Sequence, residues 1–174
     1  MHFYFPEGDQ ALITALYAGS FDPITNGHLD IATRASNIFD KVILGIFATP
    51  DKRLTFTTEE RVEMATKAVA HLKKVEVRSY STITIDFAKE IGAKVMVRGL
   101  RMVGDFEWEF EMAMMNRLLS NDVELICFMA SQQYQFLSAS LIKEVAGLGG
   151  DISTLVPAHV VEALKKKGFK PSHK

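Results

Sequence analysis

Runs of apolar residues alternate along most of the chain with segments in which apolar residues recur every three or four positions. Several runs are apolar throughout, which is typical of strands buried on both faces of a parallel sheet. The runs predict strands at residues 11–18, 41–48, 74–78, 93–98 and 123–129. The helical spacing predicts helices at residues 27–39, 57–72, 84–91, 105–119, 138–145 and 157–167.

The order of these elements predicts a single α/β domain. Five strands alternating with helices favour a Rossmann-like, doubly wound five-stranded parallel sheet with flanking helices. Because no repeat or linker marks a second domain, we expect this domain to span residues 11–167. Residues 1–10 are then an N-terminal extension, expected to be loose, and residues 168–174 a C-terminal tail. Ligands in such folds bind beyond the carboxyl ends of the strands, so the turns there are where functional residues are expected.

The segment 105–112 fits two structures. Its strict alternation of apolar and polar residues is typical of a half-exposed strand. The run continues among good helix formers, however, and a helical stripe is formed by Trp108, Met112, Met115 and Leu119. We therefore predict one long helix whose methionine-rich stripe packs into the core.

Composition and charge narrow the function classes. The chain has 174 residues, of which 48% are hydrophobic, and a net charge of −1, so a folded protein is expected and a general nucleic-acid coat is not. No apolar run reaches the roughly 20 residues of a membrane span, so no membrane partner is expected. The single cysteine, Cys127, lies in an apolar run and is expected to be buried and inert, which suits a cytoplasmic location.

The turn after the first predicted strand collects groups suited to phosphate binding. Gly19 permits a sharp turn, Ser20 adds a hydroxyl, and Thr25 or Asn26 can cap the next helix. His28 then lies in the first helical turn, where the helix dipole favours a phosphate. Without a Gly-x-x-x-x-Gly-Lys-Ser/Thr sequence, this is not a Walker-type loop.

Three blocks carry a family resemblance. Residues 19–28 (GSFDPITNGH) resemble the T/HxGH signature of the nucleotidyltransferase superfamily. Residues 97–101 (VRGLR) with 105–109 (DFEWE), and residues 138–145 (SASLIKEV) at the place of the ISSTxIR motif, resemble the bacterial phosphopantetheine adenylyltransferases in particular. The likeness spans about residues 11–167, with Ala139 where a hydroxyl residue is common.

The resemblance implies a role for each matching residue. His28 stabilises the transition state and acts with Ser20, Lys52 and Arg101 on the reacting phosphates. Lys52 and Arg98 hold the acceptor phosphate together with Ser20, and Thr84 contacts the pantetheine arm; Arg53 is a rival to Lys52. The ATP site is implied to comprise Ser20, Phe21, His28, Gly99, Leu100, Arg101, Glu109, Tyr134, Gln135, Phe136, Leu137, Ser138, Ala139 and Ser140.

The implied reaction is reversible transfer of AMP from ATP to 4′-phosphopantetheine, giving dephospho-CoA and pyrophosphate. Mg²⁺ is expected to arrive with ATP, with no metal site made by the protein itself; Asp22 fits a turn-stabilising role as well as a metal-ligand role. The family also implies a homohexamer and feedback inhibition by CoA.

Three alternatives remain open from the sequence. A nicotinamide mononucleotide adenylyltransferase and a cytidylyltransferase share the superfamily signature, and a CoA-sensing module without turnover would be the non-enzymatic alternative.

Overall fold

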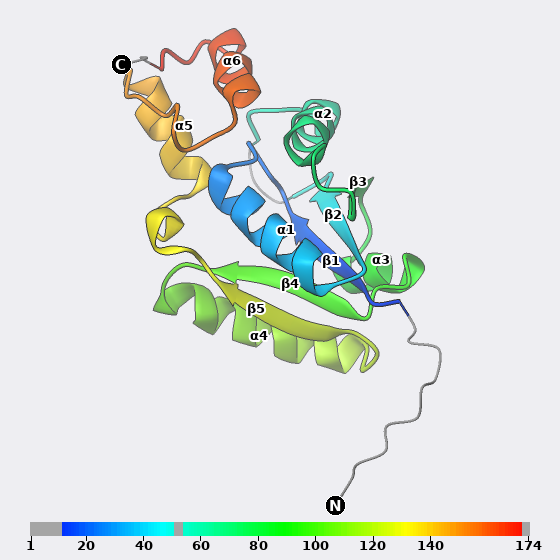
Figure 1. Cartoon of the computed structure of the whole chain (residues 1–174). Coiled ribbons are helices and arrows are strands. Elements are labelled where there is room, and N and C mark those ends of the chain that lie inside the picture. Colours follow the sequence, from blue (N-terminus) through cyan, green and yellow to red (C-terminus); the bar gives the residue numbers. More distant parts are fainter. Residues whose placement is uncertain (1–11, 51–53, 172–174) are drawn as a thin grey trace, which may run out of the picture.

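A five-stranded parallel sheet forms the centre of the protein (Figure 1). The structure is a computed structural model that describes residues 12–50 and 54–171. The strands follow one another along the chain as β1 (Thr14–Gly19), β2 (Lys41–Phe47), β3 (Val75–Tyr80), β4 (Val95–Leu100) and β5 (Glu124–Met129). All five predicted strands are confirmed, with shifts of a few residues at their ends.

The order of strands in the sheet is β3-β2-β1-β4-β5, and every neighbouring pair is parallel. The chain therefore moves outward from β1 to β3, crosses back, and continues outward through β4 and β5. The reversal of strand order between β1 and β4 is a topological switch point, where doubly wound folds bind their ligands.

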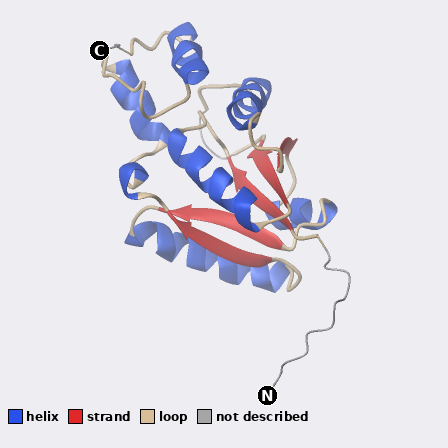
Figure 2. Ribbon diagram, in the orientation of Figure 1, coloured by secondary structure: helices blue, strands red, loops and turns tan. Residues whose placement is uncertain are grey.

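Helices cover both faces of this sheet (Figure 2). They are α1 (Asn26–Ile38), α2 (Thr58–Val69), α3 (Thr84–Glu90), α4 (Val103–Leu119), α5 (Ala139–Gly147) and α6 (Ala158–Lys166), with a short 3₁₀ helix at Gln132–Tyr134. Alternate residues of β1 enter two separate cores: Ala15 and Tyr17 pack with α1, α2, α5 and α6, and Leu16 and Ala18 pack with α3. The doubly wound α/β prediction is confirmed.

Local signals in the sequence explain where two helices begin. Thr25 caps α1 and Thr57 caps α2, and each cap forms a reciprocal capping box with the residue three positions later, His28 and Glu60. Such boxes satisfy two of the backbone N–H groups that a helix start leaves without partners. The capping box of α1 thereby fixes the position of His28, the candidate catalytic histidine.

The core prediction for α4 is wrong, although the helix itself is confirmed. The stripe of Trp108, Met112, Met115 and Leu119 is exposed, and Glu109 is the only residue of α4 that is buried. These side chains are 38–60% exposed, and only Met112 among them lines a cavity next to the sheet, with Met96 and Leu125. Helical periodicity identifies residues that share a face, but it does not say what lies against that face.

The prediction of a buried thiol at Cys127 is also wrong, because this side chain is exposed. It lies on β5, an edge strand in which Phe128 is the only buried residue. An apolar run is typical of a central strand, but an edge strand with the same composition can leave most of its side chains uncovered.

The described end of the chain is attached to the domain. Phe169 packs against the core, and the N–H of Lys170 donates to the carbonyl of Ala146. The expectation for residues 1–10 lies outside the described residues. Among the described helices, none combines the length and apolarity needed to cross a bilayer.

Candidate active site

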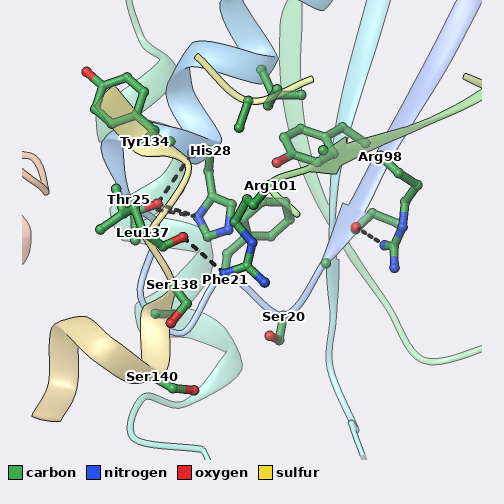
Figure 3. A pocket seen from close by; sticks show the side chains of 18 of the residues that line it. Ser20, Phe21, Thr25, His28, Arg98, Arg101, Tyr134, Leu137, Ser138 and Ser140 are labelled. Carbon is green, nitrogen blue, oxygen red and sulfur yellow. Dashed lines mark hydrogen bonds between the residues drawn. The ribbon is translucent and has the colours of Figure 1, made fainter. Parts of the chain in front are cut away.

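A cavity of about 410 Å³ opens at the switch point, beyond the carboxyl ends of β1 and β4. The turn after β1 contributes Ser20 and Phe21 to its wall, and the first turn of α1 contributes His28. The end of β4 and the residue after it contribute Arg98, Gly99 and Arg101, and Glu109 reaches it from α4. Residues far apart in the sequence thus meet where strand topology predicts a ligand site (Figure 3).

The turn between β1 and α1 has an unusual backbone. Phe21 has a φ of 46°, in the left-handed region, and the Asp22–Pro23 peptide bond is cis. The Phe21 ring packs edge-on against the rings of Tyr17 and His28. A Cβ on Gly19 would lie 3.1 Å from the Phe21 ring, so any other residue there would require this ring to shift.

His28 is held in a defined orientation by the capping box of α1. The N–H of Thr25 donates to Nδ1 of His28 over 3.0 Å, and the Thr25 hydroxyl lies 3.1 Å from the same atom. A neutral imidazole that accepts at Nδ1 carries its proton on Nε2. The cap therefore fixes both the ring orientation and the tautomer, with the N–H on Nε2.

Arg98 lies half-buried at the boundary of the cavity. Its Nε donates to Glu109 over 2.7 Å and its Nη1 donates to the carbonyl of Ala18 over 2.8 Å. Burial disfavours the charged form, but the hydrogen bond and attraction from Glu109 outweigh this and raise the pKa of Arg98. Among the described residues, Nη2 has no hydrogen-bond partner. Arg98 is thus a fixed cation with donor capacity left for an anion.

Arg101 lies in the same cavity and is held by two segments. Its guanidinium makes two hydrogen bonds to Asp105, at 3.0 and 3.1 Å, and Nη1 donates to the carbonyl of Leu137 over 3.1 Å. Tyr17 adds a buried phenol to the wall, and burial raises its pKa against the attraction of Arg98 and Arg101. The phenol is therefore neutral. Of the charged side chains that line the cavity here, Arg98 and Arg101 are positive, and Glu109 is negative and paired with Arg98.

The segment before α5 and the first residues of α5 form one more wall. From the predicted ATP site, the residues that line the cavity here are Tyr134, Leu137, Ser138, Ala139 and Ser140. Ser138 also caps α5, since its hydroxyl accepts from the N–H of Leu141 over 3.1 Å.

Three predicted ATP-site residues do not line this cavity. Gln135 and Phe136 lie in the same segment without lining the cavity, and Phe136 is 56% exposed. Leu100 is buried in the protein. The sequence analysis in turn did not single out four other lining residues. Tyr17 and Ala18 lie in β1, Ile31 lies in α1, and Ala130 directly follows β5.

A second, smaller cavity of about 50 Å³ shares Ala18, Arg98 and Glu109 with the first. Thr84, the predicted pantetheine contact, lines this second cavity, and its hydroxyl lies 3.0 Å from that of Tyr80. Arg98 and Glu109 therefore form a common wall between the two. Lys52 and its rival Arg53 lie outside the described residues.

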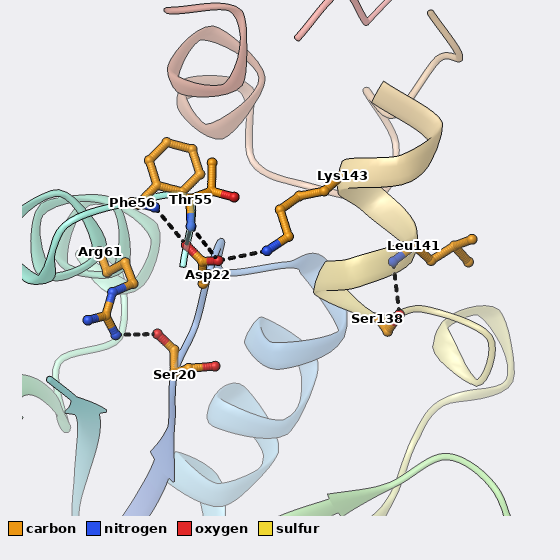
Figure 4. Close-up of polar contacts among 8 residues, drawn as sticks. All are labelled: Ser20, Asp22, Thr55, Phe56, Arg61, Ser138, Leu141 and Lys143. Carbon is orange, nitrogen blue, oxygen red and sulfur yellow. Dashed lines mark hydrogen bonds and ion pairs between the residues drawn. The ribbon is translucent and has the colours of Figure 1, made fainter. Parts of the chain in front are cut away.

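Asp22 is a structural residue in this arrangement (Figure 4). Its buried carboxylate accepts from the N–H groups of Thr55 and Phe56, at 3.0 and 2.9 Å, and pairs with Lys143 at 2.7 Å. These contacts favour the turn-stabilising interpretation over the metal-ligand one. Across the described part of the chain, no group of three or more His, Cys, Asp or Glu side chains is arranged to hold a metal ion.

Comparison with known proteins identifies the family to which the chain is related. The cytidylyltransferase-like family matches residues 16–145. Phosphopantetheine adenylyltransferase of Roseiflexus sp. (strain RS-1) is 55% identical over 87% of this chain and 95% of its own length. The enzyme of that name from Herpetosiphon aurantiacus is 50% identical over 87% of this chain and 92% of its own.

A solved structure shares the fold at much lower identity. Nicotinic acid mononucleotide adenylyltransferase from Plasmodium falciparum, complexed with APC, has a TM-score of 0.66 and 17% identity, covering 91% of this chain and 98% of that one. This likeness supports the architecture alone. The identities of 50% and above over nearly the full length of the curated relatives are what decide the family. The chain belongs to the phosphopantetheine adenylyltransferases, within the cytidylyltransferase-like family.

Proposed function

We propose that this protein transfers AMP reversibly from ATP to the phosphate of 4′-phosphopantetheine, releasing pyrophosphate and forming dephospho-CoA, a step of coenzyme A biosynthesis. The observation that carries the proposal is the convergence of Ser20, His28, Arg98 and Arg101 on one cavity at the switch point, in a chain of this family. Two polyanions must meet for this reaction, and a cavity with cationic walls lowers the cost of bringing them together.

ATP would occupy the larger cavity, with its phosphates at the start of α1 and its adenine under the segment 134–140. The first N–H groups of α1 and the helix dipole favour an anion at this place. Nε2 of His28 would donate to the α-phosphate as its negative charge grows during attack. The Thr25 contacts to Nδ1 mean that this donor is oriented before the substrate binds.

The acceptor would place its phosphate against Arg98 and extend its pantetheine arm past Thr84 into the smaller cavity. The wall shared by the two cavities supports this arrangement, since it puts the acceptor phosphate next to ATP. Lys52 stays a predicted second cation for this phosphate. The nucleophile is already an anionic oxygen, so no general base and no covalent enzyme intermediate are needed, and the protein acts by positioning and charge stabilisation.

Mg²⁺ would enter with ATP as part of the substrate, coordinated by phosphate oxygens and water. The carboxylates near the cavity fit this view, because each is engaged by a cation: Asp22 by Lys143, Asp105 by Arg101 and Glu109 by Arg98.

We also propose that the chain self-associates through the exposed apolar side of α4, as a homohexamer, and that CoA inhibits it. Trp108, Met115 and Leu118 are at least half exposed on this helix, and apolar surface of this extent favours association. Light scattering would give the number of chains in the assembly.

We also propose a cytoplasmic location. A reducing compartment of this kind suits the single exposed thiol, Cys127.

The direct test is turnover of ATP with 4′-phosphopantetheine, followed by mass spectrometry for dephospho-CoA. Pyrophosphate release is measured in parallel with nicotinamide mononucleotide plus ATP and with a small phosphate ester plus CTP. We expect product from the first pair alone. Product from another pair would replace the proposed substrates, and tight CoA binding without any turnover would indicate a sensing module.

A further inference from the structure

Arg61 is a buried cation directly behind the phosphate-binding turn, and neither the motifs nor the family resemblance assigns it a role. It lies in α2, and its side chain is 1% exposed. It heads the buried stripe of this helix, which continues with Met64, Ala65, Ala68 and Val69. Burying an arginine at a core position of a helix costs free energy, which hydrogen bonds to its donors can offset. The groups that accept these hydrogen bonds therefore indicate the role of Arg61.

Its partners are the ends of two neighbouring strands. Nη1 donates to the carbonyls of Ser20 and Phe47, both at 2.8 Å, and Nη2 donates to the carbonyl of Ala48 at 3.2 Å and the hydroxyl of Thr58 at 3.0 Å. Figure 4 shows the Arg61 contact to Ser20. Among the described residues, Arg61 forms no ion pair with a carboxylate. Three of these four hydrogen bonds go to main-chain carbonyls, while the buried Nε has no partner among the described residues.

These carbonyls belong to the two sides of the proposed reaction. Ser20 follows the last residue of β1 and starts the turn that leads to His28. Phe47 is the last residue of β2 and Ala48 follows it. The Phe47 ring packs against that of Tyr80, whose hydroxyl lies 3.0 Å from that of Thr84 at the smaller, proposed acceptor cavity. Because one nitrogen bonds the ends of both strands, a single planar group sets the spacing between the turn on the ATP side and the segment on the acceptor side.

The same contacts also affect the electrostatic potential at the turn between β1 and α1. A main-chain carbonyl oxygen carries partial negative charge and would repel a phosphate. Arg61 draws three such oxygens onto its own guanidinium, behind the turn. Burial lowers the pKa of Arg61, which Asp22 and Glu59 oppose, and an arginine remains charged in proteins.

We propose that Arg61 is a positioning residue that fixes the relative placement of the ATP and acceptor phosphates by binding the carbonyl ends of β1 and β2. This inference rests on the proposed function. Misplacement of reacting groups by about 1 Å can lower the rate about a hundredfold, so the expected defect is in kcat. Each substrate would still meet its own side of the site, so both KM values should change little.

The test compares R61K with V69A. Lysine keeps the charge but lacks the planar fork that bonds four acceptors. Val69 is a buried residue of the same helix, belongs to the hydrophobic core and does not line the proposed active-site cavities, so V69A controls for loss of stability. With both assayed well below their melting temperatures, we expect kcat of R61K to fall about tenfold or more with KM values within about threefold, and V69A to keep the wild-type kcat. Equal kcat values for R61K and V69A would overturn the proposal.

R61A adds a test by chemical rescue. The deleted side chain leaves a space lined by carbonyl oxygens, and millimolar guanidinium chloride should raise kcat several-fold where sodium chloride of the same ionic strength does not. Equal effects of the two salts would count against the proposal, and if R61A does not fold, R61K alone decides. Wild-type turnover is measured first. If the wild type makes no dephospho-CoA, the proposed substrates are wrong, and the Arg61 comparison is made with the substrate pair that the wild type does use.

Discussion

Replacement of Asp22 by asparagine should destabilise the protein strongly, because this carboxylate joins three segments. Its side chain is 3% exposed and accepts from the N–H groups of Thr55 and Phe56 and from Lys143, the last at 2.7 Å. Asparagine keeps the shape but offers one acceptor oxygen, and its NH₂ group must face another donor. Breaking a buried ion pair by removing one partner costs about 3–5 kcal/mol. Lys143 is 22% exposed and can regain some water, so we expect the lower end, about 3 kcal/mol.

The matched control is E63Q. Glu63 pairs with Lys67 at 2.6 Å, but the two side chains are 65% and 58% exposed. Exposed pairs contribute little because solvent screens them, so E63Q should destabilise the protein far less than D22N does. Urea unfolding at one fixed protein concentration measures both changes. For a chain of this length, the melting temperature of D22N should fall by about 6–12 °C. A loss for D22N no larger than that for E63Q would refute the reasoning.

Three further predictions concern the site and the sheet. H28A should lower kcat about a hundredfold or more, as expected for loss of one transition-state donor; wild-type turnover in steady-state assays would refute this role. R98A should raise KM for 4′-phosphopantetheine about tenfold or more through loss of a charge-assisted contact, whereas a defect confined to ATP would contradict it. Hydrogen bonds from Arg78 and then Lys41 lower the pKa of Glu76 to about 2. The stability this gives is complete above the unfolded pKa near 4.5 and is lost as the pH falls toward 2. E76Q should therefore flatten stability against pH over that range in acid unfolding, and an unchanged slope would argue against it.

The fold could be predicted from the sequence because each element carries its own local signal. The apolar runs that became β1 and β2, and the capping box that starts at Thr57, need no knowledge of the rest of the chain. The turn from Gly19 to His28 combines a strand end with a helix start, so its place at the carboxyl edge of the sheet follows from the topology rule.

The remaining features depend on contacts between distant segments. Whether Trp108 and Cys127 are exposed depends on whether another segment packs over them. The periodicity of the sequence does not contain this information. Asp22 reads as a turn residue in the sequence, and its partner Lys143 lies 121 positions away. For Arg61 the sequence does contain a signal, namely an arginine at a core position of α2. Its proposed role could be inferred only from the structure, which shows its contacts with the ends of β1 and β2.

The central claim is that one phosphate attacks the other directly, without a covalent intermediate on the protein. The most direct measurement is the stereochemistry at the α-phosphorus, followed by ³¹P NMR with a single stereoisomer of ATPαS and 4′-phosphopantetheine. A single in-line attack predicts inversion of configuration. Retention would require two successive displacements and would contradict the account.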